Sequence, residues 1–234
     1  MIDYLAPQCW PSTLDSYGNV LLLLGAIRRV LGSFQGTVLD IGCGHTPYKN
    51  LILSESSRAT RYIGLDLPAP NLPPPEIIWD GRVIPLREGS IDSALLTEVL
   101  EHCPDAEGVL REVHRVLRPG GFLFVTVPFI WPIHTVPHDE FRYTPFSLLR
   151  IFKRAGFPNA TIEATGGRHA VLAVTLGLWV RRRELTSRVH IVTKAVLSIL
   201  LWPLIWVLLK IDERPTELDE STLIVGLSVT AHKR

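Results

Sequence analysis

Short apolar runs rich in β-branched residues alternate along this chain with stretches of helical pattern, and this alternation restricts the fold more than any other feature. The runs that indicate strands lie at 36–42, 61–67, 76–80, 90–98 and 121–129, and later at 159–165 and 221–233. Between the fourth and fifth runs, apolar residues recur at helical spacing up to a Pro-Gly-Gly stop. Strands separated by helices form βαβ units around a parallel sheet. The sequence therefore predicts an α/β fold with a doubly wound, mostly parallel sheet of seven strands.

The apolar excess of the chain is concentrated near its C-terminus. Two runs, 170–183 and 195–209, lie between the sixth and seventh predicted strands, and Pro203 interrupts the second run. A chain of 234 residues is long enough for one full core with an appendage. We therefore expect a core with an N-terminal helix at 1–167, an inserted apolar helical hairpin at 168–212, and the final strand at 213–234.

The overall charge and the cysteine content exclude several classes of function. A net charge of +1 and a pI near 7.8 give no general attraction to nucleic acid, so we expect no such partner. The three cysteines form no Cys-x-x-Cys pair, which argues against a disulfide framework or a zinc site and favours a reducing compartment. The first residues, MIDYLAP, lack the lysines of a secretory signal. We therefore expect a cytoplasmic protein.

A glycine pair follows the first predicted strand, and an aspartate ends the second. Gly42 and Gly44, in the segment LDIGCGH, let the backbone approach a ligand closely. Asp66 follows Gly44 by 22 residues, where its carboxylate can accept both ribose hydroxyls. A dinucleotide fingerprint has a third glycine for close helix–strand packing, but Pro47 stands there in this chain. A Gly-x-Gly preceded by Asp40 instead fits an adenosine cofactor without phosphates, and S-adenosylmethionine is the common one.

Four longer segments extend this pattern in order: VLDIGCGHTPY, YIGLDL, WDGRVIPLREGSIDSALLTEVLEH and EVHRVLRPGGFLFVTVPF. Together they resemble the class I S-adenosylmethionine-dependent methyltransferases of the type 11 subgroup, over roughly residues 36 to 165. The resemblance implies S-adenosylmethionine as the cofactor. It also implies which residues bind the cofactor: Asp40, Gly42 and Gly44 around the methionine part, Asp66 and Leu67 at the ribose, Asp80 and Gly81 near the adenine amine, and Glu98 at the pocket floor. A helix cap at Asp40 and a solvated helix charge at Glu98 are the structural alternatives.

The segment PHDEFRYTP, at 137–145, follows the fifth strand and carries many polar side chains between two prolines. In the topology that the resemblance implies, this loop stands beside the transferred methyl group, so its side chains face the acceptor. Methyl transfer to a hydroxyl gains from a base of near-neutral pKa, which His138 or, in reserve, His134 can supply. Asp139 is expected to orient the histidine, and Arg142 to bind an acidic group of the acceptor. The alternative is a purely structural turn.

A metal site is a further alternative for the two histidines, which lie four residues apart. Pro132 and Pro137 exclude the helix that would place both rings on one face, so we expect no metal. His102, near a predicted helix end, is expected to be a structural hydrogen-bonding group.

The apolar hairpin has three interpretations: a buried lid, a dimer interface, or a segment that contacts a membrane. The run at 195–209 is shorter than the roughly 20 residues of a span, and a single crossing is excluded if the strands on either side pair in one sheet. Trp179, Trp202, Trp206 and the arginines Arg181, Arg182 and Arg183 are residue types that lie at a lipid headgroup layer. We expect residues 170–210 to make peripheral contact with the inner face of a membrane.

The sequence thus predicts an S-adenosylmethionine-dependent methyltransferase that acts on a hydroxyl of a sugar or a lipid-linked saccharide. The segment 137–145 also resembles a subset of these enzymes associated with bacterial cell-surface glycan assembly. Two alternatives remain. One is a membrane-associated binding protein that keeps the fold without catalysis, and the other is an NAD-dependent oxidoreductase, which Pro47 disfavours. The sequence leaves the oligomeric state open.

Overall fold

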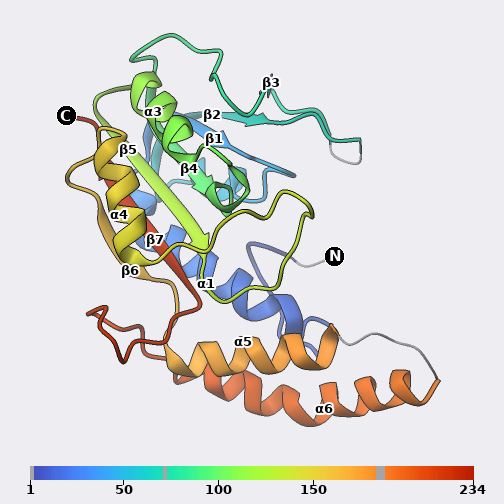
Figure 1. Cartoon of the computed structure of the whole chain (residues 1–234). Coiled ribbons are helices and arrows are strands. Elements are labelled where there is room, and N and C mark those ends of the chain that lie inside the picture. Colours follow the sequence, from blue (N-terminus) through green and yellow to red (C-terminus); the bar gives the residue numbers. More distant parts are fainter. Residues whose placement is uncertain (1–2, 71–72, 183–187) are drawn as a thin grey trace. The chain divides into compact units, whose positions relative to one another are not determined.

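The structure is a computed structural model that describes residues 3–70, 73–182 and 188–234. Its sheet contains the strands β1 Gln35–Ile41, β2 Arg58–Asp66, β3 Ile77–Ile78, β4 Ile91–Thr97, β5 Leu117–Pro128, β6 Thr161–Ala164 and β7 Gly226–His232 (Figure 1). The α-helices are α1 Leu14–Val30, α2 Lys49–Ile52, α3 Ala106–Val116, α4 Pro145–Arg154, α5 Arg168–Arg181 and α6 Arg188–Lys210. Two 3₁₀ turns, η1 Leu31–Ser33 and η2 Leu100–His102, complete the described elements.

The seven strands form one sheet in the order β3-β2-β1-β4-β5-β7-β6. The pairs β1–β2, β1–β4, β2–β3 and β4–β5 are parallel, and Leu39 of β1 stands opposite both Ile63 of β2 and Ala94 of β4. Strands β6 and β7 run antiparallel, because hydrogen bonds join Thr161 to Thr230 at one end and Thr165 to Gly226 at the other. The predicted doubly wound, mostly parallel sheet is confirmed. Its order reverses between β1 and β4, and ligands of such sheets bind there at the carboxyl ends of the strands.

Apolar side chains of the central strands form the core of the sheet. Leu39 of β1, Leu95 of β4 and Leu123 of β5 are fully buried. Helix α3 begins where Asp105 caps the backbone amide of Gly108, and its buried face consists of Ala106, Val109, Leu110, Val113 and Val116. Figure 1 shows α3 and α4 beside this part of the sheet.

Helix α4 begins at a capping box, in which the hydroxyl of Thr144 accepts from the amide of Ser147 and the hydroxyl of Ser147 accepts from the amide of Thr144. Pro145 occupies the first helical position, where its missing amide hydrogen costs no hydrogen bond. The capping box therefore anchors the C-terminal end of the loop that connects β5 to α4.

The chain divides into two compact units. One comprises Ile27–Glu163 and Leu227–Arg234 and contains nearly all of the sheet. The other combines the residues up to Ala26 with Ala164–Gly226, so the first part of α1 belongs with α5 and α6. Within this helical unit, α5 and α6 lie side by side as the predicted hairpin (Figure 1). The residues that form its buried cluster come from all three helices: Leu14, Ala173, Ile205 and Leu208.

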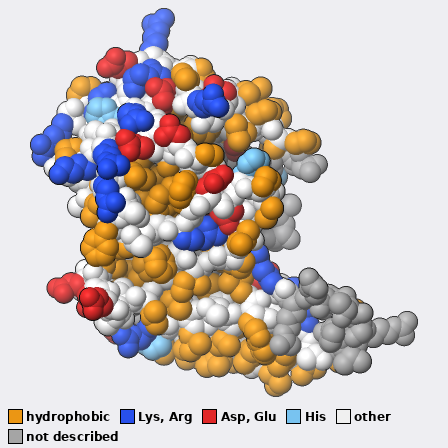
Figure 2. Space-filling model, in the orientation of Figure 1, with side chains coloured by type: hydrophobic (Ala, Val, Ile, Leu, Met, Phe, Trp, Pro, Cys, Tyr) orange, Lys and Arg blue, Asp and Glu red, His pale blue; other side chains and the backbone are white. Residues whose placement is uncertain are grey.

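The two faces of α6 differ strongly in burial. On one face, Ile205 and Ser198 are only 1% and 2% exposed. On the other face, Leu200, Ile199 and Val192 are 66%, 59% and 62% exposed. Pro203 lies inside the helix and does not end it. The stretch Ile191–Lys210 is long and apolar enough to cross a membrane, by length and composition alone, and only 17% of its apolar 18-residue window is buried. Figure 2 shows hydrophobic side chains gathered over these helices along the lower edge of the view.

Candidate functional site

The backbone turns sharply after β1 at Gly42 and Gly44, which have positive φ angles of 70° and 51°. A Cβ atom on Gly42 would lie 2.5 Å from the side chain of Val99, so only glycine fits there. A Cβ atom on Gly44 would meet no atom within 4 Å. The loop therefore presents open space and bare backbone at Gly44, as the approach of a ligand requires.

Asp66, at the end of β2, lies against this glycine turn. One carboxylate oxygen accepts from the amide of Gly44 at 2.7 Å, and the other accepts from the amide of Leu67 at 2.7 Å. An ionised carboxylate has about four lone pairs, so two remain for further donors. Leu67 is half exposed next to it. Asp66 is thus fixed in place and still able to accept two hydroxyl groups, as the sequence predicted for a ribose.

Asp80 and Gly81 lie close to Leu67, because a Cβ atom on Gly81 would lie 3.8 Å from the Leu67 side chain. The carbonyl of Asp66 accepts from the amide of Trp79, which ties the two segments together. The Asp80 carboxylate accepts from the amides of Arg82 and Val83, and these bonds hold its pKa below its usual value. The predicted ribose and adenine residues are therefore neighbours at the carboxyl ends of β2 and β3.

Asp40 lies inside the sheet unit and is 1% exposed. One of its oxygens accepts from the hydroxyl of Tyr62. The other has no partner among the described residues, and burial raises the pKa of Asp40 to about 7. Asp40 caps no helix here, so that structural alternative is wrong. Its bond to Tyr62 joins β1 to β2 directly before the glycine turn, and no sequence pattern identifies Tyr62 as its partner.

At the end of β4, Glu98 adopts a positive φ of 55° that is unusual for this residue type. Its backbone amide donates to the carbonyl and the hydroxyl of Thr126 in β5. Burial raises the pKa of the Glu98 carboxyl to about 7, against the lowering effects of Thr126 and Arg142. Glu98 precedes η2 and does not belong to a solvated helix.

Glu101, in η2, is the least expected residue of the site. Its side chain is fully buried, and neither carboxylate oxygen has a hydrogen-bond partner among the described residues. Burial and the neighbouring Glu98 raise the pKa of Glu101 to about 9. Its backbone carbonyl accepts from the amides of Glu140 and Phe141, so η2 is joined directly to the loop after β5. A buried carboxylate without partners at a strand end is typical of a functional site.

Asp139 and Arg142 form the rigid part of the loop after β5. The two terminal nitrogens of Arg142 donate to the two oxygens of Asp139 at 2.6 and 2.8 Å, and this pair holds the pKa of Asp139 well below its usual range. The same nitrogens donate to the carbonyls of Trp131, Pro132 and Phe141. Because both terminal nitrogens are engaged within the loop, the predicted role of Arg142 in binding an acceptor anion is not supported by its contacts.

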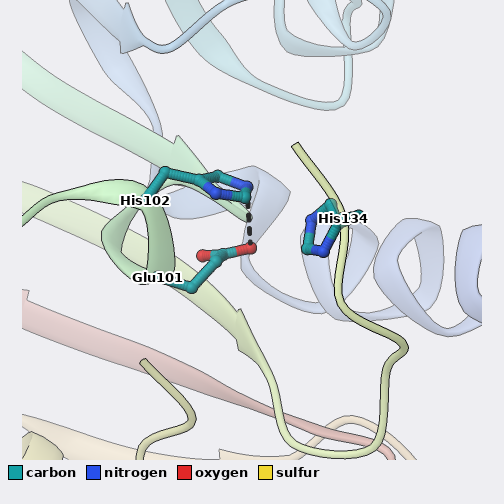
Figure 3. Close-up of side chains that lie close together, drawn as sticks. All are labelled: Glu101, His102 and His134. Atoms are coloured by element: carbon teal, nitrogen blue, oxygen red, sulfur yellow. Dashed lines mark ion pairs between the residues drawn. The ribbon is translucent and has the colours of Figure 1, made fainter. Parts of the chain in front are cut away.

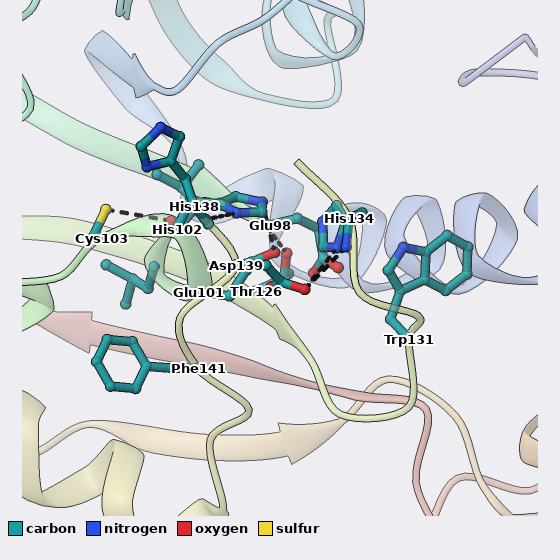
Figure 4. Close-up of polar contacts among 12 residues, drawn as sticks. Glu98, Glu101, His102, Cys103, Thr126, Trp131, His134, His138, Asp139 and Phe141 are labelled. Carbon is teal, nitrogen blue, oxygen red and sulfur yellow. Dashed lines mark hydrogen bonds and ion pairs between the residues drawn. The ribbon is translucent and has the colours of Figure 1, made fainter. Parts of the chain in front are cut away.

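The two candidate bases of the loop differ in position (Figure 4). His134 lies beside Asp139, with 3.4 Å between its Nδ1 and the carboxylate, and its side chain is 26% exposed. Burial and the neighbouring His102 lower the pKa of His134, so its ring is neutral near pH 7. The ring of His138 points away from this cluster and, within the described part of the chain, its imidazole makes no hydrogen bond.

His102 makes the structural hydrogen bond that the sequence predicted, from its Nδ1 to the carbonyl of His138 at 2.7 Å. Its ring also lies edge-on to that of His134, with 4.7 Å between the centroids. The site therefore gathers Glu98, Glu101 and His102 from the end of β4 with His134 and Asp139 from the end of β5. The segment TEVLEH gives a hint of this arrangement, because three titratable residues directly follow a buried strand.

Comparison with known proteins agrees with this geometry. A family model described as a methyltransferase domain, of type 11, matches residues 39–125. A ubiquinone biosynthesis O-methyltransferase of Chromobacterium violaceum is 31% identical over 161 residues, which cover 55% of this chain and 67% of that protein. A 37.1 kDa protein of transposon TN4556 from Streptomyces fradiae is 36% identical over 59% of this chain and 42% of its own length. The chain thus spans less than half the length of that relative.

Solved structures show the same fold at low sequence identity. A SAM-dependent methyltransferase of Thermotoga maritima has a TM-score of 0.57 at 15% identity, covering 93% of this chain and 91% of its own. The phosphoethanolamine N-methyltransferase 2 of Haemonchus contortus, solved with S-adenosyl-L-methionine, has a TM-score of 0.53 at 14% identity. That match covers 90% of this chain and 51% of the other.

Proposed function

Since this chain belongs to the class I S-adenosylmethionine-dependent methyltransferases of type 11, it is an enzyme that uses S-adenosylmethionine, and we propose that its acceptor is a hydroxyl group of a lipid-linked saccharide. The residues present fit the cofactor. Gly44 leaves open space for the methionine part, and the free lone pairs of Asp66 suit the two ribose hydroxyls. Asp80 and Gly81 stand next to Leu67 for the adenine.

The polar cluster at the ends of β4 and β5 is the main observation in favour of a hydroxyl group as the acceptor. In the reaction an oxygen–carbon bond forms as the sulfur–carbon bond of the sulfonium breaks, and the hydroxyl proton must leave. Loss of that proton needs a group that is unprotonated near neutral pH. His134 meets this requirement, because its pKa is lowered and Asp139 lies 3.4 Å from its Nδ1. We therefore assign activation of the acceptor to His134 in preference to the more exposed His138.

The relatives support oxygen as the methylated atom. The Chromobacterium violaceum protein is described as an O-methyltransferase of ubiquinone biosynthesis. A hydroxyl group of a ubiquinone precursor is therefore a candidate acceptor beside the saccharide. A phenolic lipid is accordingly the second candidate acceptor for this chain.

The helical unit supports a lipid-linked acceptor through its topology. Strands β6 and β7 are neighbours in one sheet, and α5 and α6 connect them. The chain must therefore return to the side of a membrane from which it leaves, so a single crossing by α6 is excluded. Helix α5 has 14 residues, about 21 Å, which is too short to be the second span of a bilayer core of about 30 Å. The apolar face of α6 can contact lipid only by lying along the surface.

Side chains near the C-terminal ends of α5 and α6 suit the headgroup layer. Trp206 is 45% exposed, and the ammonium group of Lys210 lies 5.7 Å from its ring centroid. Trp179 of α5 is 49% exposed, near Arg181 and Arg182. Arg183, named with them from the sequence, lies outside the described residues. Trp202, also named with them, is partly buried against the cluster of Leu14 and Ile205, so that expectation is not supported for Trp202. Indole rings and basic side chains at the edge of an apolar face are typical of interfacial helices, and they support peripheral attachment at the cytoplasmic face.

Two measurements test this function. Thermal shifts with S-adenosylmethionine, S-adenosylhomocysteine and NAD separate the cofactor classes, and we expect stabilisation by the first two alone. Incubation with methyl-labelled S-adenosylmethionine and a bacterial lipid extract should then label a lipid that survives mild alkali, as a methyl ether does. Stabilisation without any labelled product would favour the alternative of a binding protein that lacks catalysis. Labelling of a phenolic lipid would select the second candidate acceptor.

A further inference from the structure

Three side chains that can bind a metal lie together at the centre of the site. The carboxylate of Glu101 and the imidazoles of His102 and His134 each have a ligand atom within 4.8 Å of the others. Figure 3 shows the carboxylate and the two rings turned toward one another. Two of these residues come from η2 and the third from the loop after β5, so the fold and not local sequence brings them together.

The hydrogen bond of His102 determines which of its two ring nitrogens carries the lone pair. Its Nδ1 lies 2.7 Å from the carbonyl oxygen of His138, and a carbonyl can only accept, so Nδ1 carries the proton. The lone pair of the neutral ring is therefore on Nε2. This atom lies 3.7 Å from a carboxylate oxygen of Glu101, which is too far for a hydrogen bond. Two acceptors thus face each other across a gap.

His134 is oriented in the same way. Its Nδ1 lies 3.2 Å from the carbonyl of Pro132 and 3.4 Å from the carboxylate of Asp139. Both are acceptors, so Nδ1 is the protonated nitrogen and Nε2 carries the lone pair. Asp139 is itself held by Arg142. A histidine whose second nitrogen donates to a carboxylate or a carbonyl is the usual arrangement of a metal-binding histidine.

Glu101 supplies the charge. Its side chain is fully buried, and its two oxygens have no hydrogen-bond partner among the described residues. The charged groups that act on it are Glu98, Arg142 and Asp139. In the ion-bound state Glu98, Glu101 and Asp139 would carry three negative charges and Arg142 one positive charge, so the two charges that remain match a divalent cation. A buried carboxylate is stable in its ionised form only beside such a partner.

The separations fit a single small ion. Two ligands about 2.1 Å from one tetrahedral ion lie about 3.4 Å apart. The 3.7 Å between Glu101 and His102 is close to this value. The widest separation, 4.8 Å at most, needs a closure of up to roughly 1.4 Å, which a rotation of the partly exposed His134 side chain can supply. The backbone need not move, because Glu101 is tied to Glu140 and Phe141.

We propose that Glu101, His102 and His134 bind one divalent transition-metal ion of the zinc or cobalt class, with open coordination positions on the acceptor side. Two imidazoles and one carboxylate favour such ions over Ca²⁺ and Mg²⁺, which prefer oxygen ligands. The role of the ion rests on the proposed function: a hydroxyl oxygen bound to it would lose its proton more readily. That proton would pass to solvent, because the Nε2 lone pair of His134 would be engaged on the ion, and His134 would then act as a ligand in place of a base. The proposal that the ion binds depends only on the geometry of the three side chains and not on the proposed function.

Cobalt is the probe that tests the site, because its visible absorption reports imidazole coordination. The full chain should bind one Co²⁺, displaceable by Zn²⁺. His102→Ala and Glu101→Gln should weaken binding by at least 100-fold, because each removes a ligand. His138→Ala is the matched control: it removes a nearby imidazole, keeps the carbonyl that orients His102, and should bind Co²⁺ like the wild type. Absence of binding in the wild type, or equal binding by all variants, would overturn the proposal.

Two further readouts separate folding and function from binding. Each variant should bind S-adenosylhomocysteine within about twofold of the wild type, since the cofactor residues are untouched; Glu101→Asp serves as a milder ligand change if Glu101→Gln fails this check. Removal of the ion by a chelator should lower methyl transfer at least tenfold, and Zn²⁺ or Co²⁺ should restore it. Binding of Co²⁺ with turnover unaffected by the chelator would contradict the catalytic role. A protein that binds Co²⁺ as expected but methylates no hydroxyl would instead contradict the proposed function.

Discussion

The carboxylate of Asp66 accepts a hydrogen bond from the backbone amide of Gly44, 2.7 Å away. This contact joins the end of β2 to the turn after β1, so the residue expected at the ribose also holds the turn expected at the methionine part. The two halves of the cofactor site are therefore not independent.

Replacement of Asp66 by alanine should weaken S-adenosylhomocysteine binding by roughly 1.5 to 3 kcal/mol, because charge-assisted hydrogen bonds to the ribose are lost. Isothermal titration calorimetry measures this change. Glu55→Ala, an exposed carboxylate on the same unit, is the control and should leave affinity unchanged. Wild-type affinity in folded Asp66→Ala protein would refute the assignment.

The two glycines of the turn should respond differently to alanine. At Gly42 the new methyl group would collide with Val99 at 2.5 Å, so the variant should lose thermal stability. At Gly44 there is no such contact, and the strained φ costs only about 1 to 2 kcal/mol. Gly44→Ala should therefore lose cofactor affinity out of proportion to its change in melting temperature. Equal losses of stability in both variants, with affinity intact, would contradict this account.

Asp40 should make the stability of the protein depend on pH. Its pKa is raised from 3.8 to about 7 by burial, so folding favours the protonated form. The contribution is present in full below pH 4 and is lost as pH rises through 7. Relative to the wild type, Asp40→Asn should gain on the order of 2 kcal/mol in unfolding free energy between pH 5 and pH 8. Urea denaturation at both pH values checks this, and a pH-independent difference would show that Asp40 is ionised in the fold.

Membrane contact should depend on the exposed face of α6. Leu200→Glu combined with Leu204→Glu places two charges on residues that are 66% and 45% exposed, so the fold should tolerate them. The double variant should lose most of the flotation of the intact protein with anionic vesicles at low salt. Leu149→Glu, on α4 and 39% exposed, is the control and should float normally. If the intact protein does not float with the vesicles, the proposed membrane attachment is wrong.

The sequence predicted the sheet well because strand runs and stop residues are local. Gly42, Gly44 and Asp66 could be identified for the same reason, since each follows a strand directly. The orientation of His134 and the burial of Glu101 could not, because they depend on a long-range contact between η2 and the loop after β5. Proline-rich loops have no periodicity that would place their side chains. The engagement of Arg142 by its own loop is invisible in sequence for the same reason.

The most direct test of His134 as the group that activates a hydroxyl acceptor is methyl transfer by matched histidine variants of the full chain. With labelled S-adenosylmethionine and a lipid extract, the wild type should form an alkali-stable methylated lipid. His134→Ala should lower the rate at least tenfold while S-adenosylhomocysteine affinity stays within about twofold, and His138→Ala should change the rate by less than about threefold. Equal rates for the wild type and His134→Ala, or a methylated product that alkali cleaves, would contradict activation of a hydroxyl acceptor at this site.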